Sequence, residues 1–241
     1  MRAFETFARH EKEIEYVKIT QNGLSTTMHR LDRPNQEPTC LQRYRQGNYE
    51  WKDVTRDDKE AIWQSLRQMQ NHRCAYCEIH ICETPGKNHN GHIEHFWQRR
   101  RYPQGMFEWS NLFGSCDRTD SCGRHKDNQS YHPHNLIKMD IENPGYFLKF
   151  FPDGHVDPVE NLNPKEHKRA EETIRVFNLN GALRQIRERH VKGYIQTAEA
   201  LLEIAETYGL EEWSSFLQEE LTAVSGKPFE TAIRDVLRYA Q

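Results

Sequence analysis

Positions suited to burial recur every three or four residues along the last third of the chain, which is the spacing of one face of an α-helix. The series comprises Leu183, Ile186, His190, Tyr194, Ala198, Leu201 and Ala205. It predicts a helix that reaches Tyr208, preceded by a helix over 164–176 and followed by two shorter helices that end at Gln241. Charged residues fill the intervening positions, so the outer faces are expected to be solvated surfaces.

A second helical pattern lies before the middle of the chain. Acidic residues at Asp57 and Asp58 precede apolar residues at helical spacing, which predicts a helix from Asp58 to Gln70 with an acidic cap. Prolines follow Arg33 and Glu37 and interrupt any earlier helix. The first 55 residues or so are therefore expected to form loops and short elements.

Short apolar pieces separated by glycine, asparagine and proline fill the region between the helical segments. They predict short strands, with a hairpin around Pro152–Gly154. The whole pattern predicts an α+β fold that is predominantly helical. We divide it into an N-terminal loop and helical segment over 1–70 that is a candidate partner contact, a core over 71–132, and a C-terminal hairpin and helical region over 133–241.

The composition is polar for a chain of 241 residues, with 36% hydrophobic and 29% charged residues and a mean hydropathy of −0.96. We expect a thin core that a partner completes. The net charge of −3 gives no overall attraction to nucleic acid, so any such binding must come from local basic patches. Neither a long apolar run nor a signal-peptide core after Met1 is present, and we expect a cytoplasmic protein.

Four of the six cysteines stand in two pairs, Cys74 with Cys77 and Cys116 with Cys122. Without a secretory signal, metal binding or reduced thiols explain them better than disulfides do. The two pairs can together form a tetrahedral four-sulfur zinc site. Polar neighbours argue against plain burial of these thiols as small apolar groups. The second pair is spaced more widely than in a tight knuckle, which keeps His80 and Cys82 as alternative ligands.

The segment Gly91 to His95 lies between the two cysteine pairs and reads as a strand. Alternation along a strand places Glu94 and His95 on opposite sides unless the strand end bends. A histidine can take a proton from water, and a carboxylate can hold a hard divalent cation against a phosphate. This combination suits the hydrolysis of a phosphodiester.

The segments Cys-Ala-Tyr-Cys-Glu, Ile-Glu-His-Phe, Asn-Leu-Phe-Gly-Ser-Cys and Cys-Gly-Arg-His-Lys follow one another in this order. Together they resemble the core of zinc-stapled HNH (His-Me finger) nucleases. The resemblance implies a ββα-metal core flanked by N-terminal and C-terminal helical segments. It also implies that His95 is the general base, that Glu94 binds a catalytic metal, and that Asn111 fixes the loop that carries the base.

The last motif departs from the pattern of that family. An Asn or His usually follows the last zinc cysteine, whereas this chain has Gly123. His125 is the nearest suitable side chain, and we assign it as the second ligand of the catalytic metal. Asp127 and Asn128 are the alternatives.

Segments outside the core extend the resemblance over nearly the whole chain. They are Pro38 to Trp51, Asn71-His72-Arg73, Pro152 to His155, and 170–180 followed by Arg184 and Arg187. These segments are similar to retron-associated and Septu-type (PtuB-like) HNH endonucleases. The similarity implies an anti-phage defence effector that acts on DNA or RNA with an ABC/SMC-like (PtuA-like) ATPase. In retron systems it also implies a reverse transcriptase with its RNA–DNA product.

A basic stretch comes directly after the predicted base. Arg99, Arg100 and Arg101 can hold a phosphate backbone while aromatic neighbours pack or stack on the bases. Arg124 and Lys126, beside the last cysteine, can contribute in the same way. The alternative interpretation is a solvated loop of arginines.

These assignments combine into one mechanism. A Mg²⁺ or similar divalent ion held by Glu94 and His125 polarises the scissile phosphate, His95 activates water, and the zinc ion is structural. One alternative is a catalytically inactive zinc-stapled adaptor or nucleic-acid-binding subunit of such a complex, which Gly123 favours. Another is a zinc-dependent hydrolase of small substrates, which would need an open position on the zinc ion.

Overall fold

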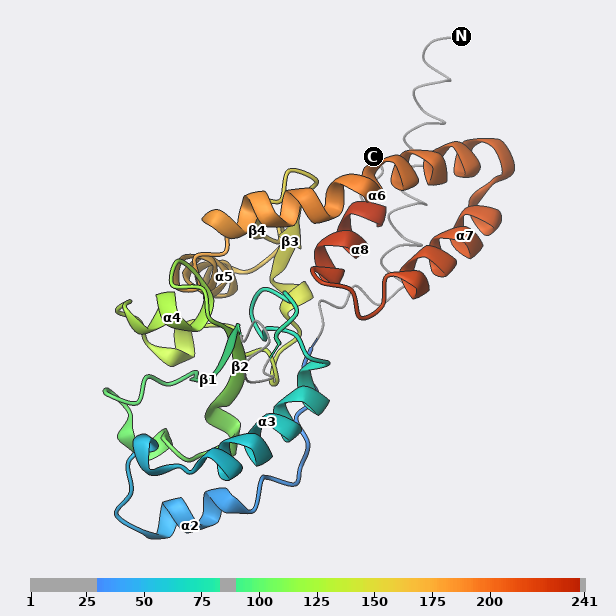
Figure 1. Ribbon diagram of the computed structural model, residues 1–241. Helices are drawn as coiled ribbons and strands as arrows, with labels where there is room; N and C mark the ends of the chain where they lie inside the picture. The colour runs from blue at the N-terminus through green and yellow to red at the C-terminus, as the bar shows by residue number, and fades with distance from the viewer. Residues whose placement is uncertain (1–29, 83–89, 239–241) are drawn as a thin grey trace.

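The computed structural model describes residues 30–82 and 90–238, and the structural statements below concern those residues (Figure 1). The fold is α+β and mostly helical, as the sequence pattern predicts. Residues 1–29 and the predicted helix end at Gln241 lie outside the described part.

Two antiparallel strands lie at the centre of the lower body in Figure 1. Strand β1 (Gly91–His95) pairs with β2 (Leu112–Cys116), so that Gly91 lies opposite Cys116. Two short 3-10 helices, η2 (Pro103–Gly105) and η3 (Trp109–Asn111), lie in the connection between the strands. Helix α4 (Cys122–Asp127) follows β2 and packs against it.

The N-terminal part of the described chain contributes α2 (Cys40–Gln46), η1 (Trp51–Asp53) and α3 (Arg56–Gln70). Helix α3 ends where the sequence predicts but begins two residues before Asp58. The cap is Thr55, whose side chain accepts a hydrogen bond from the backbone N–H of Asp58, so the acidic residues lie in the first turn instead of capping it. Helix α3 packs against β2 and leads directly into the first cysteine pair.

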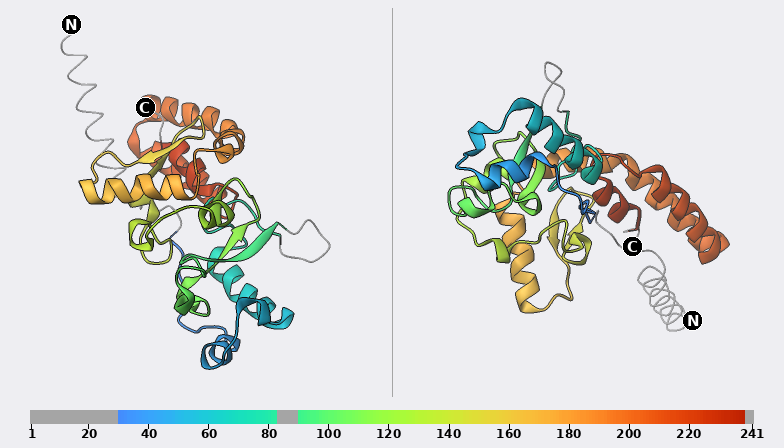
Figure 2. Two further views of the ribbon diagram at one scale, coloured as in Figure 1. Left: turned by 90° about the vertical axis from the view of Figure 1, so that its left-hand side faces the viewer. Right: turned by 90° about the horizontal axis from the view of Figure 1, so that it is seen from below.

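The C-terminal part follows the predicted pattern closely. After η4 (Pro133–Asn135) and η5 (Pro144–Tyr146), β3 (Leu148–Phe150) and β4 (Val156–Pro158) form the predicted hairpin. Gly154 lies in its turn with φ +75°, a conformation that favours glycine. The helices are α5 (Pro164–Val176), α6 (Ala182–Tyr208), α7 (Leu210–Ala223) and α8 (Glu230–Arg238). Figures 1 and 2 show α6 and α7 as an arm that extends away from the body.

Buried apolar side chains form one cluster that runs from Leu31 to Leu237. The expectation of a thin core is therefore wrong for the described residues, because the polar residues are concentrated on the surface. None of the helices in the described part of the chain is long and apolar enough to cross a lipid bilayer.

Candidate metal centre and active site

The first cysteine pair lies in a turn that the backbone attaches to β2. The N–H of Glu78 donates to the carbonyl of Cys74 (3.0 Å), which closes the turn, and the N–H of Ala75 donates to the carbonyl of Gly114 (3.0 Å). The side chain of Gln70, at the end of α3, donates to that same carbonyl (2.8 Å) and accepts from the N–H of Gly114 (2.7 Å). These bonds place the first pair beside Cys116.

The fourth cysteine is positioned by the C-terminal half of the chain. The N–H of Cys122 donates to the carbonyl of Phe177 (2.9 Å), just after the end of α5. Cys122 has φ +56°, a left-handed conformation that costs a non-glycine residue roughly 1–3 kcal/mol. Such a conformation persists only where the surrounding contacts enforce it, and here it turns the thiol toward the other three.

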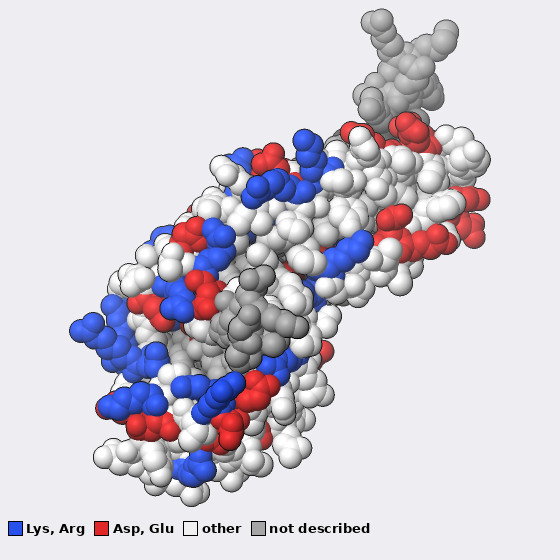
Figure 3. All heavy atoms as spheres, in the orientation of Figure 1, with Lys and Arg blue, Asp and Glu red and all other residues white. Residues whose placement is uncertain are grey.

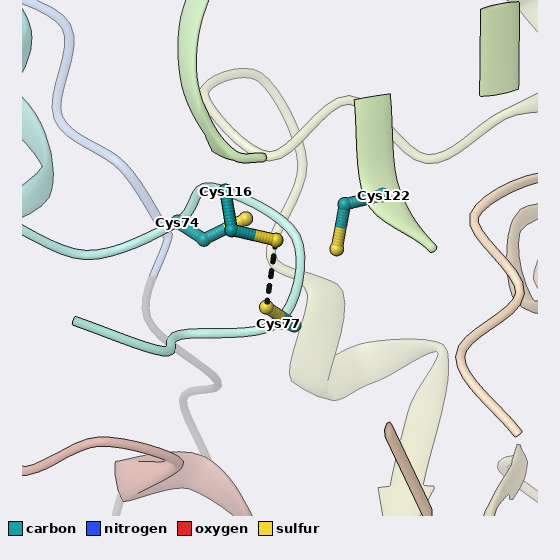
Figure 4. Close-up of side chains that lie close together, drawn as sticks. All are labelled: Cys74, Cys77, Cys116 and Cys122. Atoms are coloured by element: carbon teal, nitrogen blue, oxygen red, sulfur yellow. Dashed lines mark hydrogen bonds between the residues drawn. The ribbon is translucent and has the colours of Figure 1, made fainter. Parts of the chain in front are cut away.

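The four sulfur atoms of Cys74, Cys77, Cys116 and Cys122 lie within 4.8 Å of one another (Figure 4). The Sγ atoms of Cys77 and Cys116 are 3.9 Å apart. Zn–S bonds of about 2.3 Å in a tetrahedron place neighbouring sulfurs about 3.8 Å apart, so the cluster fits a zinc ion. It is the candidate metal-binding group found among residues 30–82 and 90–238, and His80 and Cys82 are not part of it.

All four cysteines are buried, contrary to the exposure suggested by their polar neighbours. Burial raises the pKa of the Cys77 and Cys122 thiols. Burial also opposes ionisation of Cys74, but hydrogen bonds from the other cysteines lower the pKa of its thiol. A divalent ion at the centre would supply the positive charge that four thiolates need in this buried place.

His95 lies at the end of β1 with its ring orientation fixed. Its Nε2 atom is 2.9 Å from the carbonyl oxygen of Met106, which can only accept, so Nε2 carries the proton and Nδ1 has a free lone pair. Its ring packs edge-on against Trp51, with ring centroids 4.4 Å apart. Burial lowers the pKa of His95 to about 3, and the charge of Arg99 acts in the same direction. The imidazole is therefore neutral at physiological pH.

Asn111 fixes the loop that follows His95. Its Oδ1 accepts from the N–H of Trp97 (2.6 Å), and its Nδ2 donates to the carbonyl of Gly105 (2.9 Å). Gly105 directly precedes Met106, the partner of His95. One buried amide therefore fixes both the residues after the histidine and the segment that orients its ring.

Glu94 and His95 contact different parts of the protein, as strand alternation predicts. The Oε1 atom of Glu94 is 2.7 Å from Nζ of Lys126, and Oε2 accepts a hydrogen bond from the hydroxyl of Tyr76. Lys126 also donates to the carbonyl of His95 (2.9 Å) and to the hydroxyl of Tyr131 (3.1 Å). Burial disfavours the charged form of Lys126, but Glu94 and its other neighbours raise the pKa of the ammonium group.

His125, the assigned second ligand, contacts other residues. Its Nδ1 is 2.9 Å from the carbonyl oxygen of Val176, and its Nε2 is 3.4 Å from Nε2 of Gln129. Of the two alternatives, Asp127 binds the ammonium group of Lys126 (2.6 Å) and Asn128 donates to the carbonyl of Arg124 (3.0 Å). The structure thus joins Glu94 to Lys126, and it does not place the His125 ring against Glu94.

His92 is a further histidine close to Glu94 that the predicted motifs do not include. A Cβ atom built on Gly123 would overlap Cγ of Glu94 and would lie 3.1 Å from Nε2 of His92, so both side chains face the same point on α4. The Nδ1 atom of His92 is 3.1 Å from Oδ1 of Asp117. The sequence could have indicated this, because His92 and Glu94 are two residues apart on a predicted strand and therefore share one face of it.

The predicted arginine patch borders an open groove. Arg99, Arg100 and Arg101 line it together with Gln98 and residues 127–130, and its volume is about 800 Å³. Gln98 donates to three backbone carbonyls between residues 126 and 129 (3.0–3.1 Å) and so joins the two walls. Figure 3 shows Lys and Arg side chains interspersed with Asp and Glu over the body, while Asp and Glu gather toward the far end of the arm.

The two other predicted basic contacts differ from the arginines of the groove. Arg124 is exposed and pairs with Asp117 through Nη2 and Oδ1, 2.6 Å apart. The Lys126 side chain has no exposed area and lies beneath β1 with Glu94. As the structure stands, Lys126 does not reach the surface where nucleic acid would bind.

No family model matches the chain. A curated protein described as "Septu protein PtuB", from Bacillus thuringiensis, is 30% identical over 179 residues. The alignment covers 73% of this chain and 62% of that protein, so the chain spans less than two thirds of the length of its relative. The aligned region is much longer than the stretch from Cys74 to Lys126, and the similarity therefore extends beyond the metal centre.

Proposed function

We propose that this protein is a metal-dependent HNH endonuclease that hydrolyses phosphodiester bonds of nucleic acid as the effector of an anti-phage defence complex. The observation that carries the proposal is the geometry of His95. It ends the first strand of a strand–strand–helix unit whose second strand carries one of the four clustered cysteines at its other end. A backbone carbonyl leaves its Nδ1 ready to accept a proton.

The proposed reaction follows from this geometry. Nδ1 of His95 takes a proton from water as the water oxygen attacks phosphorus, and the bond from phosphorus to the leaving oxygen breaks. The leaving oxygen then takes a proton from solvent. Asn111 and Met106 keep the imidazole in the required tautomer and orientation. When bound, a divalent ion such as Mg²⁺ supplies charge stabilisation for the leaving oxygen.

Glu94 is the carboxylate that would hold this ion. Its Oε1 atom forms an ion pair with Lys126 at 2.7 Å but lacks a contact with hydrogen-bond geometry. A carboxylate oxygen has more than one lone pair and can contact both a cation and an ammonium group. The residue therefore fits a metal-ligand role in which Lys126 stays close.

The four cysteines are proposed to hold a structural zinc ion. Four thiolate ligands leave no open position for water or substrate, so this ion would stabilise the fold and take no part in hydrolysis. The same argument disfavours a zinc-dependent hydrolase of small substrates.

The groove lined by the three arginines supports nucleic acid as the substrate. A guanidinium group can donate two parallel hydrogen bonds to a phosphate group. The three arginines concentrate positive charge at the groove, although the net charge of the chain is −3. We expect the chain alone to bind nucleic acid weakly. Weak binding suits an enzyme whose substrate is presented by a larger complex.

The similarity to the PtuB protein supports a role in Septu-type or retron-associated defence. The proposed partner is an ABC/SMC-like ATPase, joined in retron systems by a reverse transcriptase and its RNA–DNA product. The second candidate is an inactive adaptor or nucleic-acid-binding subunit of such a complex. The absence of a side chain at Gly123, on the part of α4 that faces Glu94, favours that candidate.

The test is to purify the chain with the product of a neighbouring ATPase gene. DNA and RNA pools are then incubated with the complex, with and without nucleotide and with and without chelator at a dose that leaves zinc bound. We expect divalent-dependent cleavage that His95→Ala abolishes. Nucleic acid binding without cleavage in every condition would instead support the adaptor.

A further inference from the structure

His92 and Glu94 are alternate residues of β1 and share the strand face that looks toward α4. Where their side chains converge, α4 presents Gly123, which has no side chain. A Cβ atom at that position would overlap Cγ of Glu94 and would lie 3.1 Å from Nε2 of His92 and 3.0 Å from Oγ of Ser115. The glycine therefore lets these strand side chains lie directly against the backbone of α4, and Cγ of Glu94 and Nε2 of His92 both approach that one point.

The carboxylate of Asp117 lies beside the imidazole of His92. Its Oδ1 is 3.1 Å from Nδ1 of His92, and Arg124 holds the same carboxylate through Nη2 at 2.6 Å. A carboxylate near Nδ1 favours the proton there and leaves the lone pair on Nε2, the atom that approaches Gly123 on α4. The contact is electrostatic and lacks hydrogen-bond geometry. Histidines that bind metals almost always have such a partner for their other N–H.

His92 and His125 also differ in their exposure to solvent and in the contacts of their ring nitrogens. The His92 side chain is 22% exposed while Glu94 is fully buried, so a cation can enter from the histidine side. By contrast, the two ring nitrogens of His125 contact Val176 and Gln129.

We propose that His92, and not His125, is the second protein ligand of the divalent ion bound by Glu94, with Asp117 orienting its ring. Strand β1 then supplies both protein ligands, and the absence of a side chain at Gly123 lets them lie against α4. Waters and a substrate phosphate complete the coordination. An imidazole beside a carboxylate favours Mn²⁺, Co²⁺ or Ni²⁺ over Mg²⁺. The catalytic role of this ion rests on the proposed function, but its binding does not.

The experiment measures Mn²⁺ binding by the zinc-loaded full chain with electron paramagnetic resonance. The signal of unbound Mn²⁺ during a titration gives the dissociation constant. Modulation of the spin echo by a directly bound ¹⁴N nucleus reports a histidine ligand. The wild type is expected to bind Mn²⁺ with ¹⁴N modulation. His92→Ala should weaken binding at least tenfold and abolish the modulation, and Asp117→Asn should weaken it by roughly 10–100-fold.

His125→Ala is the discriminating variant and should retain both affinity and modulation. His167→Ala on α5, whose side chain is 46% exposed, is the matched control for loss of a surface histidine. Zinc content and melting temperature are recorded for every variant. A variant with altered zinc is replaced by His92→Gln, which keeps a polar side chain but cannot reproduce the ¹⁴N modulation of an imidazole ligand.

Three outcomes overturn the proposal. They are a wild type that binds no Mn²⁺, a His92→Ala variant with unchanged affinity, and a His125→Ala variant that loses binding. In the last case, retained cleavage by the His92→Ala complex would leave the proposed nuclease intact with His125 as its ligand. Conversely, Mn²⁺ binding through His92 in a complex that cleaves nothing would refute the nuclease and leave the metal site.

Discussion

The cysteine cluster and strand β1 are two neighbouring sites built in opposite ways. In the cluster, four like ligands converge on one point, and backbone hydrogen bonds from three separate parts of the chain place them. On β1, each functional side chain has its own protein partner. Glu94 pairs with Lys126, His92 with Asp117, and His95 with the carbonyl of Met106.

The difference fits the two roles proposed for these sites. A structural site is complete once its ion is bound, so its ligands need no other partner. A catalytic site must be stable both before and after ion and substrate arrive. An isolated buried carboxylate costs several kcal/mol, and Lys126 offsets that cost in the free protein.

The largest expected effect comes from Cys77→Ser, which tests whether the cluster is structural. Removing one ligand should sharply weaken zinc binding, whose free energy at such sites is about 10–16 kcal/mol and contributes directly to folding. We expect loss of zinc and a melting temperature lower by more than about 10 °C. Elemental analysis and calorimetry measure both. Cys40→Ser, a half-buried cysteine outside the cluster, is the control, and unchanged zinc in Cys77→Ser would exclude Cys77 as a ligand.

His95→Ala tests whether β1 carries a residue that acts in cleavage without stabilising the fold. Loss of a general base lowers the rate by roughly 10²–10⁴-fold, and zinc content should not change because no cysteine contact is touched. Single-turnover cleavage by the assembled complex is the measurement, with His167→Ala as the control. If cleavage persists at the wild-type rate, another residue must be the base.

Lys126→Met tests whether the positive charge of Lys126 offsets the buried negative charge of Glu94. Leaving Glu94 buried without its cation should cost about 3–5 kcal/mol in the free energy of unfolding, measured with denaturant. Adding Glu94→Gln to this variant should recover part of the loss, because no buried charge is then unpaired. Mn²⁺ should stabilise Lys126→Met more than the wild type, since the ion would replace the missing positive charge. Equal stability of Lys126→Met and wild type would show that the pair carries no such balance.

The sequence pattern predicted those features that depend only on the spacing of nearby residues. Helical periodicity gave α5 with its correct bounds, and the cysteine pairs gave the ligands that converge in the fold. The burial of those cysteines depends on packing from residues such as Phe177, far along the chain, and local polarity could not show it. The pairing of Glu94 with Lys126 likewise depends on how α4 lies across the hairpin.

The smallest effect is expected from Arg100→Ala in the groove, which tests whether the β1 region also binds the substrate. One lost phosphate contact lowers the salt slope of nucleic acid binding by about 0.9. The affinity advantage of the wild type should therefore shrink roughly threefold as salt rises from about 50 to 200 mM. Titrations at several salt concentrations measure this slope, and Arg189→Ala, exposed on α6, is the control. Equal slopes for the three proteins would mean that Arg100 is only solvated, and the substrate would then have to reach His95 by another face.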